Sequence, residues 1–79
     1  MLQILLLDRD ATEAFELRRA FEACPTARLT YTADVATAVR LLASRHWDLV
    51  VADPALPVDF DRLKRIKKSR RWLATRSHA

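Results

Sequence analysis

Glycine is absent from this 79-residue chain, and cysteine occurs once, at Cys24. Without glycine the chain cannot form the tight phosphate-binding loops of dinucleotide-binding and P-loop proteins, in which the backbone closely approaches the phosphate. A single cysteine excludes an intramolecular disulfide and a zinc knuckle, and it is typical of a reducing compartment. Apolar runs such as residues 4–7 are far too short to span a bilayer. We therefore expect a soluble, cytoplasmic protein with no membrane partner.

Charge is divided between an acidic body and a basic end. Residues 1–61 contain all ten acidic residues and six arginines, a formal charge of −4, whereas residues 62–79 contain eight basic residues and no acid. The length predicts a single small domain, residues 1–79, in which residues 59–79 form a basic C-terminal helix or tail. We define the basic patch as Arg62, Lys64, Arg65, Lys67, Lys68, Arg70 and Arg71.

Three interpretations of the basic patch stay open: a solvated helix face, a surface for a protein partner, and a contact with nucleic acid. No acid lies within the segment to pair with these cations, and like charges at helical spacing repel. An acidic partner, including the body of a second copy, would relieve that repulsion. Binding to nucleic-acid phosphates would weaken steeply with added salt.

Apolar patterning predicts strands that alternate with helices. Residues 2–7 and 49–52 are apolar runs typical of strands covered on both faces, and residues 28–32 are rich in strand-favouring side chains. Asp10 and Asp34 stand where helix N-caps are expected, each followed by an apolar stripe at helical spacing. A third, cationic helix is expected from residue 59. Residues 72–75 either continue it or begin a short extended segment.

This order of elements is typical of a three-layer α/β fold, in which crossover helices cover a parallel sheet. Right-handed crossovers give three strands in the order 2-1-3. The first and third strands, which are then neighbours, end in Asp8 and Asp53. Functional groups collect at the carboxyl ends of parallel strands, so we expect both carboxylates to face one crevice. Such a pair can hold Mg²⁺, or one aspartate can accept a phosphoryl group while a metal screens its charge.

These features resemble the receiver (CheY-like) domain of bacterial two-component response regulators, over about residues 2–68. The resemblance rests on residues 4–10 (ILLLDRD) and, more specifically, on residues 48–57 (DLVVADPALP), an apolar strand ending in the Asp-x-x-(Met/Leu)-Pro pattern of the phospho-acceptor strand. It implies a flavodoxin-like fold, here truncated to β-α-β-α-β-α. It also implies that Asp53 occupies the phospho-acceptor position and that Asp8 and Asp10 belong to the acidic pocket.

One departure from the family falls in this pocket. Arg9 stands where the family has its second acid, a direct Mg²⁺ ligand. A guanidinium does not bind metal, so we expect Arg9 to replace the cation beside Asp53 or Asp8. Asp10 is expected to cap a helix rather than to substitute as a ligand. We expect no cofactor; if Mg²⁺ did bind, Asp8 and Asp53 would be its ligands.

The second departure is length. The family's fourth and fifth strands carry a Ser/Thr and a Lys that contact the phosphoryl group. Neither strand is predicted here, and Thr75 is only a minor candidate to replace the hydroxyl. Three strands in the order 2-1-3 would leave residues 49–52 at an edge, and apolar edges invite pairing. We therefore expect a homodimer that hides the third strand or the face of the first helix.

Together these observations predict a degenerate receiver-like signalling module of the two-component, phosphorelay type, without enzymatic activity. It would act by phosphorylation-independent homodimerisation or by binding another signalling protein. Asp53 would then be the structural partner of Arg9. In one alternative, Asp53 instead remains a phospho-acceptor for a histidine kinase or a small phosphodonor. In the other, the basic patch binds nucleic acid.

Overall fold

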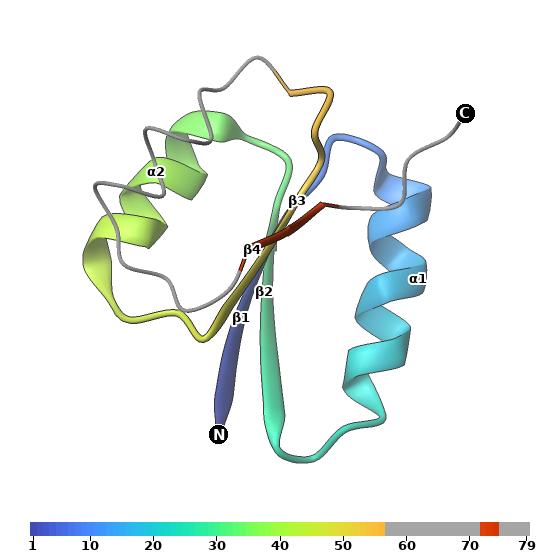
Figure 1. Ribbon diagram of the computed structural model, residues 1–79. Coiled ribbons are helices and arrows are strands. Elements are labelled where there is room, and N and C mark those ends of the chain that lie inside the picture. Colours follow the sequence, from blue (N-terminus) through green and yellow to red (C-terminus); the bar gives the residue numbers. More distant parts are fainter. Residues whose placement is uncertain (57–71, 75–79) are drawn as a thin grey trace.

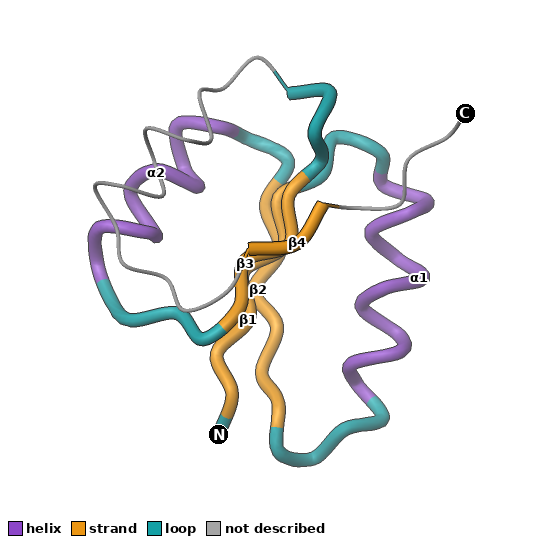
Figure 2. Tube along the Cα trace, viewed as in Figure 1, coloured by secondary structure: helices purple, strands orange, loops and turns teal. Residues whose placement is uncertain are grey.

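The computed structural model describes residues 1–56 and 72–74, which form an α/β fold (Figure 1). In chain order the elements are β1 (Leu2–Leu7), α1 (Ala11–Glu22), β2 (Ala27–Thr32), α2 (Val35–Ser44), β3 (Leu49–Ala52) and β4 (Trp72–Ala74). All strand pairs are parallel, and the sheet has the order β2-β1-β3-β4. Helix α1 lies on one face of the sheet and α2 on the other (Figures 1 and 2). The predicted α/β class and the order 2-1-3 of the first three strands are thereby confirmed.

Strand β4 corrects the expectation that the third strand lies at an edge. It pairs with the side of β3 that does not face β1, in the register Val50↔Trp72 to Ala52↔Ala74. The apolar residues of β3 therefore lie between two strands, which removes the exposed edge that the sequence predicts. Of the two alternatives for residues 72–75, the extended one is confirmed for 72–74. The predicted third helix and the basic patch lie outside the described residues.

Both described helices begin at the predicted aspartate caps. Asp10 Oδ1 accepts hydrogen bonds from the backbone N–H groups of Thr12 (3.0 Å) and Glu13 (3.3 Å). Asp34 Oδ2 accepts from both the N–H (2.9 Å) and the hydroxyl (2.6 Å) of Thr37. Each carboxylate thus satisfies donors that the first turn of a helix leaves without intrahelical partners. The caps fix where each helix leaves the end of the preceding strand.

Side chains of β1 alternate between the two layers. Ile4 and Leu6 pack in the cluster that includes Ala14 of α1, whereas Leu5 and Leu7 pack in clusters that include residues of α2. All four side chains are buried. A strand covered on both faces is expected to be continuously apolar, as residues 4–7 are. Within the described residues, no helix is long and apolar enough to cross a membrane.

Trp47 closes the α2 side of the core. Its side chain is 1% exposed and packs with Leu5, Leu42 and Val50. Its indole Nε1 donates a hydrogen bond to the carbonyl oxygen of Leu41 (2.8 Å), so the one polar atom of the ring is satisfied. This tryptophan joins the end of α2 to the start of β3.

Candidate functional site

The candidate site lies at the carboxyl ends of β1 and β3. Asp8 directly follows β1 and Asp53 directly follows β3, and the two strands pair in parallel up to Leu7↔Ala52. The backbone N–H of Asp53 donates to the carbonyl oxygen of Leu7 at 2.8 Å, which continues the ladder past the end of the strand. The structure therefore brings the two predicted aspartates to the same edge of the sheet.

Asp8 is fully buried rather than open to a crevice, which corrects the expectation for this side chain. Its Oδ1 accepts a hydrogen bond from the backbone N–H of Asp10 at 2.8 Å. In the described part of the chain no donor reaches its Oδ2. Position 8 continues the alternation of Ile4 and Leu6, which places it on the α1 side of the sheet.

Two residues that sequence reasoning did not assign to the site contribute to the surroundings of Asp8. The hydroxyl of Tyr31, near the end of β2, donates to the backbone carbonyl oxygen of Asp8 at 2.8 Å. The carboxylate of Glu13, in the first turn of α1, raises the pKa of Asp8. The predicted strand order 2-1-3 already places the end of β2 beside Asp8. The position of Tyr31 near that end was therefore the feature of the sequence that could have indicated this contact.

Burial raises the pKa of Asp8 above its ordinary value of 3.8. Desolvation is the largest cause, and the negative charges of Glu13, Asp53 and Asp10 add to it, whereas the hydrogen bond from the N–H of Asp10 acts in the opposite direction. A buried carboxylate with like charges nearby favours its protonated form. The pocket therefore disfavours further negative charge.

We expect the Asp8→Asn variant to have a higher free energy of unfolding than the wild type at neutral pH. Between 3.8, the pKa in the unfolded chain, and the raised pKa of the native state, the native protein holds a proton that the unfolded chain has lost. Wild-type stability therefore falls as pH rises through this window, and the loss is complete above the native pKa. The asparagine variant has no such group to titrate.

Urea unfolding of both proteins across this pH range checks the expectation, and the two stabilities should converge towards pH 3.8. Asp10→Asn is the matched control, because asparagine caps helices about as well as aspartate and should leave stability within about 0.5 kcal/mol. A neutral-pH loss of stability in Asp8→Asn would mean that the Asp8 carboxylate is stabilised by its surroundings.

Arg9 pairs with Asp53 across the site. The Nε of Arg9 lies 3.8 Å from Oδ2 of Asp53, and the arginine side chain is 61% exposed while that of Asp53 is 14% exposed. The other oxygen of Asp53, Oδ1, accepts a hydrogen bond from the backbone N–H of Ala55 at 2.9 Å. Both carboxylate oxygens of Asp53 therefore have partners within the chain. An ion pair this exposed contributes little to the stability of the fold. Its main effect is to place a positive charge beside the Asp53 carboxylate.

The described residues do not fit a Mg²⁺ ion. Within this part of the chain, no group of three or more His, Cys, Asp or Glu side chains is arranged to hold a metal. Asp10 caps α1, as the sequence predicts. Arg9 places a permanent positive charge beside Asp53. A hard divalent cation prefers several oxygen ligands and would meet this guanidinium at its binding position.

Of the predicted site residues, the structure gathers Asp8, Arg9, Asp10 and Asp53 at one end of the sheet. The basic patch lies outside the described residues. Comparison of the chain with family models, curated proteins and solved structures finds no match.

Proposed function

We propose that this protein is a degenerate receiver-like signalling module that acts by binding a second copy or another signalling protein, without phosphorylation. The observation that carries the proposal is the Arg9–Asp53 ion pair at the ends of β1 and β3. The proposal includes a flavodoxin-like arrangement, in which the third helix expected from residue 59 would precede β4.

The charges of the site support this proposal. Phosphoryl transfer to an aspartate needs a cation that screens both the incoming phosphate and the carboxylate. Arg9 supplies a positive charge that is covalently part of the chain, so the charge state of the pocket does not depend on a metal. The positive charge beside Asp53 is therefore present with or without a bound metal ion.

The environment of Asp53 disfavours the alternative in which it accepts phosphate. One of its oxygens faces Arg9 and the other accepts the N–H of Ala55, and both contacts draw negative charge from the carboxylate and make it a weaker nucleophile. The neighbouring Asp8 lies in surroundings that disfavour added negative charge.

Incubation with acetyl phosphate and Mg²⁺, followed by intact mass measurement, tests the proposal. We expect no added phosphate on the wild-type chain. A phosphate that is added to the wild type and to an Asp34→Asn control, but not to Asp53→Asn, would contradict the proposal and establish Asp53 as a phospho-acceptor.

The nucleic-acid alternative has a separate test. A gel shift at low salt that disappears with added salt would assign the basic patch to phosphate binding. We expect no shift, because the proposed partner is a protein.

A further inference from the structure

Strand β2 is the edge of the sheet opposite β4, and its outer backbone groups point away from β1. The N–H of Leu2 donates to the carbonyl oxygen of Thr26, and the N–H of Asp8 donates to that of Thr32. In a parallel pair the backbone N–H and C=O groups of every second residue point towards the neighbouring strand. In β2 these are the groups of the even-numbered residues, which point towards β1. The N–H and C=O groups of Leu29 and Tyr31 therefore point outward.

These two outward N–H groups have no backbone acceptor in the described part of the chain. The third odd-numbered residue of the strand, Ala27, already donates its N–H to the carbonyl oxygen of Cys24 at 3.2 Å. An edge strand with free N–H and C=O groups is a template on which another strand can pair. The side chains of Leu29 and Tyr31 are only partly buried, so a partner strand would cover them further.

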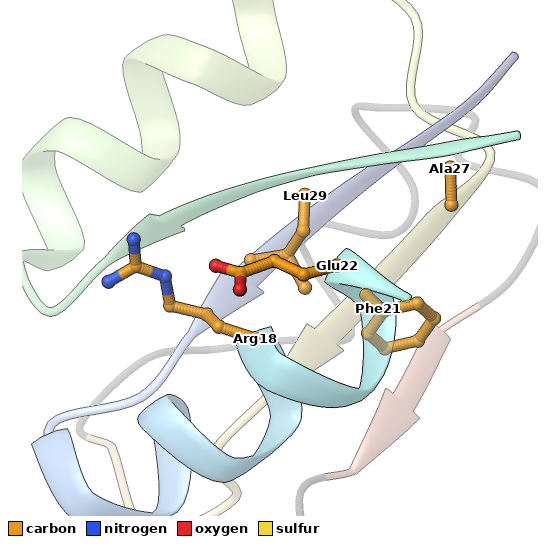
Figure 3. Close-up of a pocket in the computed structure, with 5 residues that line it drawn as sticks. All are labelled: Arg18, Phe21, Glu22, Ala27 and Leu29. Atoms are coloured by element: carbon orange, nitrogen blue, oxygen red, sulfur yellow. The ribbon is translucent and has the colours of Figure 1, made fainter. Parts of the chain in front are cut away.

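A hollow of about 100 Å³ lies beside this edge, between α1 and β2 (Figure 3). It is lined by Arg18, Phe21, Glu22, Ala27 and Leu29. The apolar part of the lining comes from both elements, while α1 contributes one cation and one anion a single turn apart. The guanidinium of Arg18 also lies 5.8 Å from the centre of the Tyr31 ring, which places this cation level with the later part of β2.

We propose that β2 pairs antiparallel with β2 of a second copy, about a twofold axis through Leu29. This inference rests on the proposed function in that the module acts by binding a copy of itself, and it names the surface. An axis perpendicular to the sheet keeps each side chain on its own face, so residues of equal parity must lie opposite each other. An axis at Arg28 would place like charges directly opposite, which is unfavourable.

The axis at Leu29 uses the outward backbone groups. The N–H of Leu29 donates to the carbonyl oxygen of the partner's Leu29, and the N–H of Tyr31 donates to that of the partner's Ala27. Symmetry doubles each bond. The α1 helices of the two copies then lie on the same face and run antiparallel across the axis.

The charges beside the hollow are self-complementary in this arrangement. Glu22 is the last residue of α1, just before the turn that leads into β2 at Ala27, whereas Arg18 lies one helical turn earlier, level with Tyr31. When Ala27 faces the partner's Tyr31, Glu22 of one copy faces Arg18 of the other. In a twofold interface each contact occurs twice, so the cation of each copy lies opposite the anion of the other.

Charge exchange between copies tests the interface. Arg18→Glu gives a copy with two acids at the hollow, and Glu22→Arg gives a copy with two cations. In light scattering coupled to size exclusion, we expect wild-type dimers at micromolar concentration and dimers of each single variant weakened by at least about tenfold. An equimolar mixture of the two variants should again form dimers, because each acid then faces a cation. Circular dichroism of each variant shows that it is folded.

The outcomes separate this surface from the proposed function. Wild-type dimers that are unaffected by either single variant, or variants whose mixture stays monomeric, would overturn the β2 interface and leave self-association standing through another surface. A wild-type monomer at these concentrations would overturn both this interface and self-association.

Discussion

The Arg9→Asp variant is expected to bind Mg²⁺ more tightly than the wild-type chain, whose described residues do not fit the ion. The substitution replaces the guanidinium beside Asp53 with a third carboxylate at the end of β1, next to the buried Asp8. Three carboxylates at the ends of two neighbouring strands are the oxygen donors that a hard divalent cation prefers. It also restores an acid at the position where the resemblance to receiver domains implies a metal ligand.

Without metal the same variant should be less stable than the wild type, because the added charge lies near carboxylates that already raise the pKa of Asp8. Thermal unfolding with and without Mg²⁺ measures both effects: a lowered melting temperature that rises on addition of the ion. Arg9→Ala is the matched control, since it removes the cation and adds no ligand, and its melting temperature should respond little to Mg²⁺. If the melting temperature of the Arg9→Asp variant does not change with Mg²⁺, these strand ends do not form a receiver-type pocket.

Replacing Trp47 with alanine should remove a large share of the free energy of unfolding. The side chain is 1% exposed and packs against both β1 and β3, so the change removes a large apolar group and leaves a cavity. Truncations of this kind cost about 3–5 kcal/mol, whereas a domain of this length has a total stability of only about 4–12 kcal/mol. Far-ultraviolet circular dichroism during urea unfolding measures the loss.

Trp47→Phe keeps most of the ring volume and removes the hydrogen bond from Nε1 to the carbonyl oxygen of Leu41. It should cost less than the alanine variant, with about 1 kcal/mol arising from the lost bond. Phe15→Ala is the surface control: this phenylalanine is 56% exposed, and its removal should change stability by no more than about 0.5 kcal/mol. Equal losses at positions 47 and 15 would contradict the assignment of Trp47 to the core.

The sequence was informative wherever a structural feature has a local cause. Continuous apolar runs identify β1 and β3 because both faces of these strands are covered, and Asp10 and Asp34 identify helix starts because their carboxylates bond to donors two or three residues away. The proximity of Arg9 and Asp53 was also accessible, because both lie within two residues of the ends of strands that right-handed crossovers make neighbours.

Features that depend on packing were not accessible in the same way. A three-residue segment such as 72–74 has too little periodicity to distinguish strand from helix, and its pairing is decided by the free side of β3. The burial of Asp8 depends on where α1 crosses the sheet, which no pattern within residues 2–10 specifies. The orientation of the Tyr31 hydroxyl towards β1 has the same origin.

The central place of β1 has a consequence for how the chain reaches its fold. This strand precedes both of its partners in the sequence, with β2 beginning at Ala27 and β3 at Leu49. During synthesis its first ladder can close once β2 has left the ribosome, but its second side stays unpaired until β3 follows. Parallel pairing between such distant segments is slow compared with helix formation, and an apolar strand waiting for its partner is prone to aggregate. The yield of folded protein should therefore depend on how quickly β3 follows β1.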